Sequence, residues 1–171
     1  MRKYAREVAF SMVYGYLMTG DREDKIPEEL FDGRKLDSSD ADFVFDVYNG
    51  VIGCADRYEE LIGKYSEGFR SERIYRVDKA LLLSAMSEIE TIKTPAPVVI
   101  DEIVSFAKKY STEKSTGFIN GILGSFMRER EKRIACEAAE EDKNRNFGIK
   151  LDPRSVKEGE ILQKAFIPDE E

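Results

Sequence analysis

Apolar residues recur every three or four positions along most of the first 130 residues, which is the period of an amphipathic helix. The pattern predicts a first helix over residues 2–19, and the Gly20-Asp21 pair marks its end. Residues 20–37 are polar and contain Pro27 and Gly33. They predict a connecting loop with one short helical turn around residues 28–31.

A second helix is expected to start at Ser39, because Ser39 and Asp42 have the spacing of a capping box. Gly50 and Gly53 weaken this helix, since glycine in a helix interior costs up to about 1 kcal/mol. Two interpretations of the glycines are open. Either the helix breaks near Gly53 and a separate short helix covers residues 55–62, or a neighbouring element packs closely against it.

The polar stretch 66–68 predicts a boundary, after which the helical pattern repeats. One helix is expected over about residues 71–91. The segment 94–97 contains two prolines and predicts a stop followed by a new helix, because proline is tolerated in a first turn. A last core helix runs through Phe118 to Phe126. Because no strand alternation could build a sheet, the predicted fold is all-α, with six or seven helices in two small bundles.

From Arg128 the composition changes. Residues 128–142 are almost all charged or alanine, which favours a helix that lacks core residues. Residues 144–171 contain two glycines and two prolines and end in three acids, so mostly irregular structure is expected there. The chain is thus predicted to have a helical domain over residues 1–130 and a charged, acidic C-terminal extension over residues 131–171.

The overall composition fits a globular protein with a heavily charged surface, because 42% of the residues are hydrophobic and 36% are charged. No apolar run approaches the roughly 20 residues that span a bilayer. The first residues are charged and do not resemble a signal peptide. We therefore expect a cytoplasmic protein without a membrane partner.

Several kinds of chemistry are excluded by the residues that the chain lacks. It contains no histidine, which removes the usual near-neutral acid–base group and imidazole metal sites. Cys54 and Cys136 are far apart and predict two reduced thiols, and no glycine-rich phosphate loop occurs. The acids Glu72, Asp78, Glu88, Asp101 and Glu102 lack a ligand spacing and are expected to face solvent. No enzyme activity, metal or cofactor is expected.

A basic start to the first helix is the sharpest candidate site. Arg2 and Arg6 share one helix face and Lys3 lies beside them, although a helix N-terminus favours anions. Cations against this preference suit a phosphate partner, and a solvated helix end is the alternative. Since the net charge is −7, binding of nucleic acid would have to use this local patch and would be modest and sensitive to salt.

Five motifs in order resemble the NusB family of transcription antitermination factors. They cover about residues 2–128: Arg2-Lys3-Tyr4-Ala5-Arg6-Glu7-Val8-Ala9 with Val13-Tyr14, Asn49-Gly50-Val51, Val77-Asp78-Lys79-Ala80-Leu81-Leu82, Val99-Ile100-Asp101-Glu102, and Phe118-Ile119-Asn120-Gly121-Ile122-Leu123. The resemblance implies two three-helix bundles. It also implies that the protein pairs with NusE, a small ribosomal subunit protein, binds boxA-type single-stranded RNA and helps RNA polymerase antitermination complexes read through ribosomal RNA operons.

The family's contacts map onto particular residues of this chain. The resemblance implies RNA contacts at Arg2, Lys3 and Arg6 and at the start of the last helix, and NusE contacts on a separate acidic face. The implied RNA-binding residues are Arg2, Lys3, Tyr4, Arg6, Lys114 and Phe118, and the implied partner-binding residues are Tyr14, Glu72 and Asp78. Tyr4 stands where the family often has a third basic residue, so here it is expected to stack on a base.

A different class of function remains open beside this one. The same helices could form a protein–protein interaction module, or a homodimer that buries the first helix, without binding RNA. Phe118 allows either interpretation, because it could stack on a base or enter the core.

Overall fold

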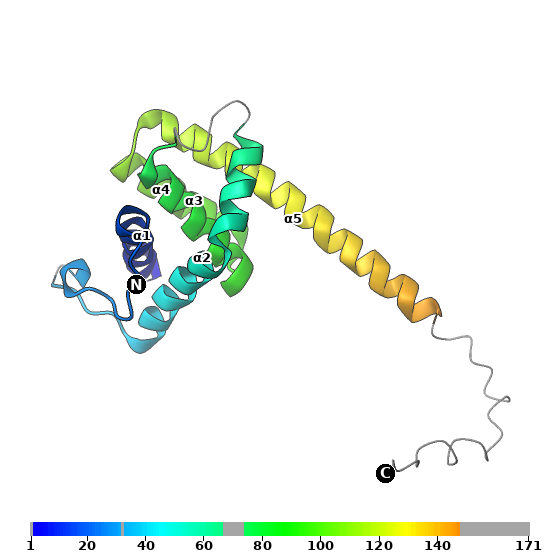
Figure 1. The fold of residues 1–171 in the computed structure, drawn as a ribbon, viewed down its shortest axis with the longest axis horizontal. Helices are drawn as coiled ribbons and strands as arrows, with labels where there is room; N and C mark the ends of the chain where they lie inside the picture. The colour runs from blue at the N-terminus through cyan, green and yellow to red at the C-terminus, as the bar shows by residue number, and fades with distance from the viewer. Residues whose placement is uncertain (1, 32, 67–73, 148–171) are drawn as a thin grey trace, which may run out of the picture. The chain divides into compact units, whose positions relative to one another are not determined.

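The computed structural model describes residues 2–31, 33–66 and 74–147, and within these ranges the chain forms helices and no strands (Figure 1). The expected all-α class is confirmed. The elements are α1 (Arg2–Thr19), the 3-10 turn η1 (Glu28–Phe31), α2 (Ser38–Tyr65), α3 (Arg76–Ser87), the π-helical turn η3 (Glu88–Ile92), α4 (Ala96–Tyr110) and α5 (Glu113–Phe147). The predicted bounds of α1 and of the short turn η1 are both confirmed.

Helix α2 differs from the prediction at its start and in its length. It begins one residue earlier, because the side chain of Asp37 caps it by accepting a 2.7 Å hydrogen bond from the Asp40 amide. It then continues as one helix of 28 residues, so the predicted break near Gly53 is wrong. Buried Tyr58 and Ile62 anchor its second half in the core.

Close packing explains the glycine at position 50. A Cβ at Gly50 would lie 2.3 Å from Ser87 Oγ, which donates a 2.8 Å hydrogen bond to the Val47 carbonyl. A Cβ at Gly53 would meet nothing within 4 Å. The close-packing interpretation is therefore correct for Gly50, and the helices predicted separately on either side of Gly53 are one helix.

The second half follows the prediction with one change of helix type. The chain is helical over Arg76–Ser87 as expected, whereas residues 71–73 lie outside the described ranges. The last turn of the predicted helix is π-helical, and Lys93 ends it with a left-handed φ of 60°. The proline segment starts α4 as predicted, with Pro95 O accepting the first helical hydrogen bonds.

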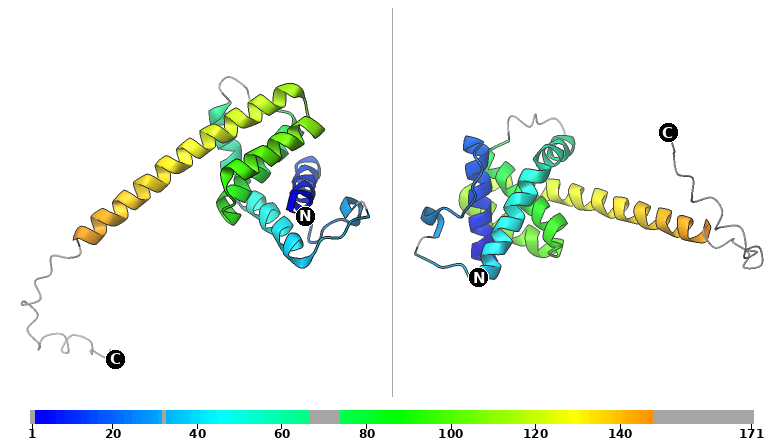
Figure 2. Two further views of the ribbon diagram at one scale, coloured as in Figure 1. Left: turned by 180° about the vertical axis from the view of Figure 1, so that it is seen from behind. Right: turned by 60° about the horizontal axis from the view of Figure 1, so that its bottom comes forward.

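The core lies where α1, α2 and α3 pack on one another and where α3 packs on α4 (Figure 2). Four side chains of α5 complete it: Ile119, Ile122, Leu123 and Phe126. The end of α2 is tied to α5, because Lys64 Nζ and Tyr65 Oη lie 2.6 and 2.7 Å from Glu129 Oε2. Helix α2 therefore contacts α1 near its beginning and α5 at its end.

The compact helical unit extends to Arg130. Helix α5 continues through residues 131–147, so the irregular structure expected from residue 144 is wrong for residues 144–147. Its alanine-, glutamate- and lysine-rich sequence favours a helix up to Gly148. The rest of the predicted extension, residues 148–171, lies outside the described ranges. Among the described helices, none has the length and apolar character needed to cross a membrane.

Candidate nucleic-acid interface

Each cation at the start of α1 faces a carboxylate from another element. The sequence predicts these cations as a phosphate site or a solvated helix end, and it does not predict their carboxylate partners. The ion pairs join Arg2 Nη1 to Asp40 Oδ1 of α2 at 3.2 Å, Lys3 Nζ to Glu102 Oε2 of α4 at 3.3 Å, and Arg6 Nη2 to Glu88 Oε1 of η3 at 2.8 Å. The basic patch is thus neutralised within the protein and holds α1 to its neighbours.

The Arg6–Glu88 pair is buried. The exposed fractions of the two side chains are 8% and 2%, and Arg6 donates three hydrogen bonds of 2.8–3.0 Å to the carboxylate. A guanidinium in this position offers almost no surface to a phosphate. The expectation that Arg6 contacts RNA directly is corrected here, because its donors turn inward to η3.

Arg2 and Lys3 remain accessible, with side-chain exposures of 44% and 60%. Each also lies over a ring: the Arg2 guanidinium is 4.6 Å from the centroid of Phe43, and Lys3 Nζ is 5.9 Å from that of Phe106. The Lys3–Glu102 pair is the more exposed of the two, and such pairs contribute little stability, about 0–1 kcal/mol, whereas Asp40 is only 7% exposed. A phosphate can therefore compete with the carboxylates for Arg2 and Lys3.

Tyr4 has a different role from the one expected. It is half-buried, and its hydroxyl lies 3.0 and 2.6 Å from the carbonyl oxygens of Leu30 and Phe31, so it holds η1 against α1. The Arg34 guanidinium lies 4.9 Å from its ring centroid. Tyr4 is thus engaged within the protein, and Arg34 is an additional cation near α1 that the sequence pattern did not reveal.

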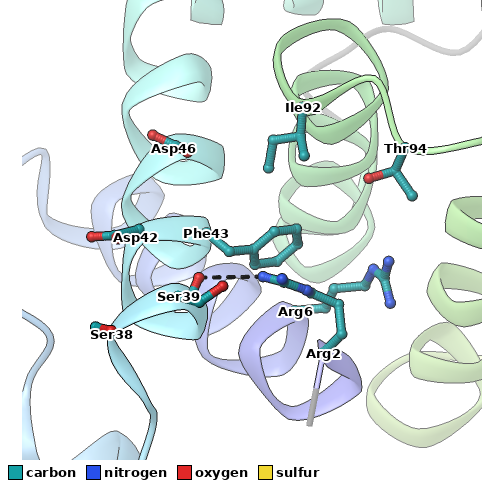
Figure 3. A pocket seen from close by; sticks show the side chains of 9 residues that line it. All are labelled: Arg2, Arg6, Ser38, Ser39, Asp42, Phe43, Asp46, Ile92 and Thr94. Atoms are coloured by element: carbon teal, nitrogen blue, oxygen red, sulfur yellow. Dashed lines mark hydrogen bonds between the residues drawn. The ribbon is translucent and has the colours of Figure 1, made fainter.

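A pocket of about 530 Å³ opens beside Arg2, between the starts of α1 and α2 and the end of η3. We call it the α1–α2 pocket. Its lining combines two arginines, an aromatic ring and an isoleucine with hydroxyls and carboxylates: Arg2, Arg6, Ser38, Ser39, Asp42, Phe43, Asp46, Ile92 and Thr94 (Figure 3). The pocket continues the accessible surface of Arg2 into a cavity with an apolar wall.

The residues predicted at the start of the last helix line a second cavity, the α3–α5 pocket. It measures about 420 Å³ and is lined by Ile74, Tyr75, Asp78, Thr112, Lys114, Ser115 and Phe118. Lys114 is exposed, whereas Phe118 is half-buried and packs against the core. The structure therefore brings the predicted RNA-binding residues Lys114 and Phe118 together with the predicted partner-binding residue Asp78.

Asp78 does not contribute to an exposed acidic face as predicted. This side chain is buried, with 3% exposure, and its Oδ2 accepts a 2.8 Å hydrogen bond from Ser115. Its carboxylate turns inward, and through this hydrogen bond it holds the start of α5. Tyr14 is half-buried beside Phe10, with ring centroids 6.4 Å apart, and Glu72 lies outside the described residues. The expectation that all five acids face solvent is also wrong for Asp78 and Glu88.

A further cross-helix contact links Glu7 of α1 to the end of α4. Glu7 accepts a 2.6 Å hydrogen bond from Lys109 and another from Tyr110. Burial acts to raise the pKa of Glu7, but the two hydrogen bonds together with the charges of Lys109 and Arg34 leave the pKa below its ordinary value. The hydrogen bond to Glu7 in turn raises the pKa of Lys109 to about 12.

This contact predicts a pH-dependent contribution to stability. Because the pKa of Glu7 is lowered on folding, its contribution is present above the ordinary value of 4.5 and is lost as the pH falls through the folded-state pKa. We expect Glu7→Gln to reduce the loss of unfolding free energy between about pH 6 and about pH 3, measured by urea titration at each pH. The exposed Asp101→Asn is the matched control. An equal pH dependence in all three proteins would contradict the prediction.

This chain is similar to known proteins in its family pattern, in sequence and in fold. The model of the NusB family matches residues 3–128. Transcription antitermination protein NusB of Finegoldia magna is 33% identical over 131 residues, covering 76% of this chain and 96% of that protein, and its counterpart from a Thermoanaerobacter species is 34% identical, covering 75% and 91%. NusB of T. maritima superposes with a TM-score of 0.66 at 26% identity, over 75% and 92% of the two chains. A crystal structure of the antitermination factors NusB and NusE in complex with dsRNA gives 0.66 at 22% identity, over 75% and 96%.

Proposed function

The chain belongs to the NusB family, and on that premise we propose that it is a transcription antitermination factor that binds boxA-type RNA together with NusE. It would act as an adaptor for RNA polymerase read-through, notably of ribosomal RNA operons, rather than as an enzyme. The observation that carries the RNA-binding proposal is the accessible pair Arg2 and Lys3 at the start of α1, where the helix amides add to the attraction for phosphate.

The ion pairs explain why a second protein is needed. To reach a phosphate, Arg2 has to weaken its contact with Asp40, and Lys3 its contact with Glu102. The net charge of −7 adds a repulsive field. Binding by this protein alone is therefore weak, and a basic partner strengthens it by supplying further positive surface to the RNA.

Asp78 supports the second part of the proposed surface from beneath. It fixes Ser115 in the first turn of α5, next to Lys114, while the Ser115 hydroxyl also lies 2.9 Å from that of Thr112. This arrangement orients Lys114 toward solvent and Phe118 toward the α3–α5 pocket. We propose that Lys114 and Phe118 contact RNA, that Tyr14 and Glu72 contact NusE, and that Asp78 positions the start of α5 that carries Lys114 and Phe118.

The proposal is tested by titrating boxA-type RNA with this protein, with and without NusE, over a range of salt concentrations. We expect NusE to raise the affinity. Changing both Arg2 and Lys3 to glutamine should weaken binding and reduce the salt slope by about 2, since each removes one phosphate contact.

Lys64→Gln is the matched control, because it removes an exposed, ion-paired cation at the other end of α2. It should leave both affinity and slope unchanged. RNA binding that gains nothing from NusE, or an Arg2/Lys3 variant with the wild-type slope, would contradict the proposal. NusE binding without any RNA binding would instead identify a protein–protein module.

A further inference from the structure

We propose that the α1–α2 pocket is a nucleotide subsite, in which one unpaired base of the RNA strand stacks on the guanidinium of Arg2. This inference rests on the proposed function and adds to it a site for a base. The phosphate contacts proposed above carry no sequence information, whereas a base held in a pocket can be discriminated.

The guanidinium of Arg2 is held in place as a flat platform. Asp40 Oδ1 lies 3.2 Å from Nη1, the Ser39 carbonyl accepts from the same nitrogen at 3.4 Å, and the Phe43 ring lies against the group (Figure 3). All three contacts are made by residues in the first turns of α2. Proteins stack unpaired bases on arginine planes as well as on aromatic rings, and a platform that is already ordered loses less entropy on binding.

The cavity has the size and lining that a base requires. Its volume of about 530 Å³ lies within the range of small-molecule sites. Figure 3 shows Ile92 and Thr94 beyond the Phe43 ring as seen from the Arg2 guanidinium, so this part of the lining is apolar and carries a hydroxyl. The π-helical turn and the left-handed Lys93 set the positions of these two residues.

The charges around the cavity favour a base over a phosphate inside it. Asp42 and Asp46 belong to the lining on the α2 side, and in Figure 3 their carboxylates point away from Arg2. Two carboxylates at this rim repel a phosphate, while an uncharged base can place an N–H group toward the Thr94 hydroxyl. The phosphates of the same strand then remain on the outer surface, at Lys3 and at the edge of the Arg2 guanidinium away from Nη1, the nitrogen that contacts Asp40 and Ser39.

The test combines protein variants with RNAs that lack one base. The RNAs are a series of boxA-type strands, each with a single abasic nucleotide at a different position. Each RNA is titrated against wild type and Arg2→Lys in the presence of NusE. Arg2→Lys keeps the charge and can pair with Asp40, but it has no planar group to stack. We expect one position at which base removal weakens wild-type binding about tenfold, with little effect in Arg2→Lys. The salt slope should be the same for both proteins.

Thr94→Trp provides a second variant, because the indole fills the cavity and should remove the same position-specific effect. Val98→Trp, at an exposed position on α4, is its matched control, and thermal unfolding verifies that both fold. If Arg2→Lys and Thr94→Trp keep the wild-type response at every abasic position, the subsite is wrong while the proposed function stands. If wild type with NusE does not bind the RNA at all, both are wrong.

Discussion

Replacing Glu88 with glutamine is expected to lower the free energy of unfolding by about 3–5 kcal/mol, because it leaves the Arg6 charge buried without its counter-charge. The pair is almost completely shielded from water, and all three hydrogen bonds from Arg6 go to this one carboxylate. The desolvation of the guanidinium is then no longer compensated. Such a loss is a large part of the total stability of a domain of this size.

The matched experiment removes both charges. The double variant Arg6→Met and Glu88→Leu fills a similar volume with apolar groups and should lose far less stability than Glu88→Gln alone. Urea-induced unfolding followed by circular dichroism measures all three proteins. If the double variant is at least as unstable as the single one, the penalty does not come from an uncompensated buried charge.

Replacing Gly50 with alanine is expected to lower the free energy of unfolding by about 1–3 kcal/mol, the usual cost of overpacking a core. The added Cβ would lie 2.3 Å from Ser87 Oγ and 2.9 Å from Thr91 Cγ2. Ser87, the last residue of α3, is fully buried and its hydroxyl is bonded to the Val47 carbonyl, so relief requires loss of that hydrogen bond or a shift of the α3–η3 junction away from α2. Such a shift would also disturb Glu88 and the wall of the α1–α2 pocket.

Gly53→Ala on the same helix is the control for helix propensity. This position is exposed and a Cβ there meets nothing within 4 Å, so alanine should raise stability by up to about 1 kcal/mol. The two substitutions are identical in chemistry and should have opposite signs in thermal and urea unfolding. A stabilising Gly50→Ala would show that the close approach of α2 and η3 does not constrain residue 50.

Local pattern was sufficient to predict most helices. The apolar period of α1, the polar loop with its turn at residues 28–31, and the proline start of α4 depend on neighbours in sequence, and all three were confirmed. Of the two interpretations left open for the glycines of α2, the break near Gly53 is wrong and close packing at Gly50 is correct, for a physical reason. A glycine weakens an isolated helix, but at residue 50 its lack of a side chain is what allows another element to approach.

The candidate site was only half predictable for a related reason. The cations at the start of α1 are visible in sequence, but their partners Asp40, Glu88 and Glu102 are distant along the chain and belong to three elements. Only the packed structure shows that Arg6 is buried while Arg2 and Lys3 are accessible. No periodicity distinguishes an acid that faces solvent from one that receives an arginine in the core.

The single helix α2 also has a consequence for how the protein unfolds. Its beginning is bonded to α1 through Asp40 and its end to α5 through Lys64 and Tyr65. At 1.5 Å per residue, its 28 residues give a length of about 42 Å along the helix path, which bends between its two halves (Figure 1). Since α1 and α5 both pack against this helix, neither contact can be lost without disturbing the packing of α2. We therefore expect the described residues up to Arg130 to unfold cooperatively, so that a change where α2 meets α1 alters the stability where α2 meets α5.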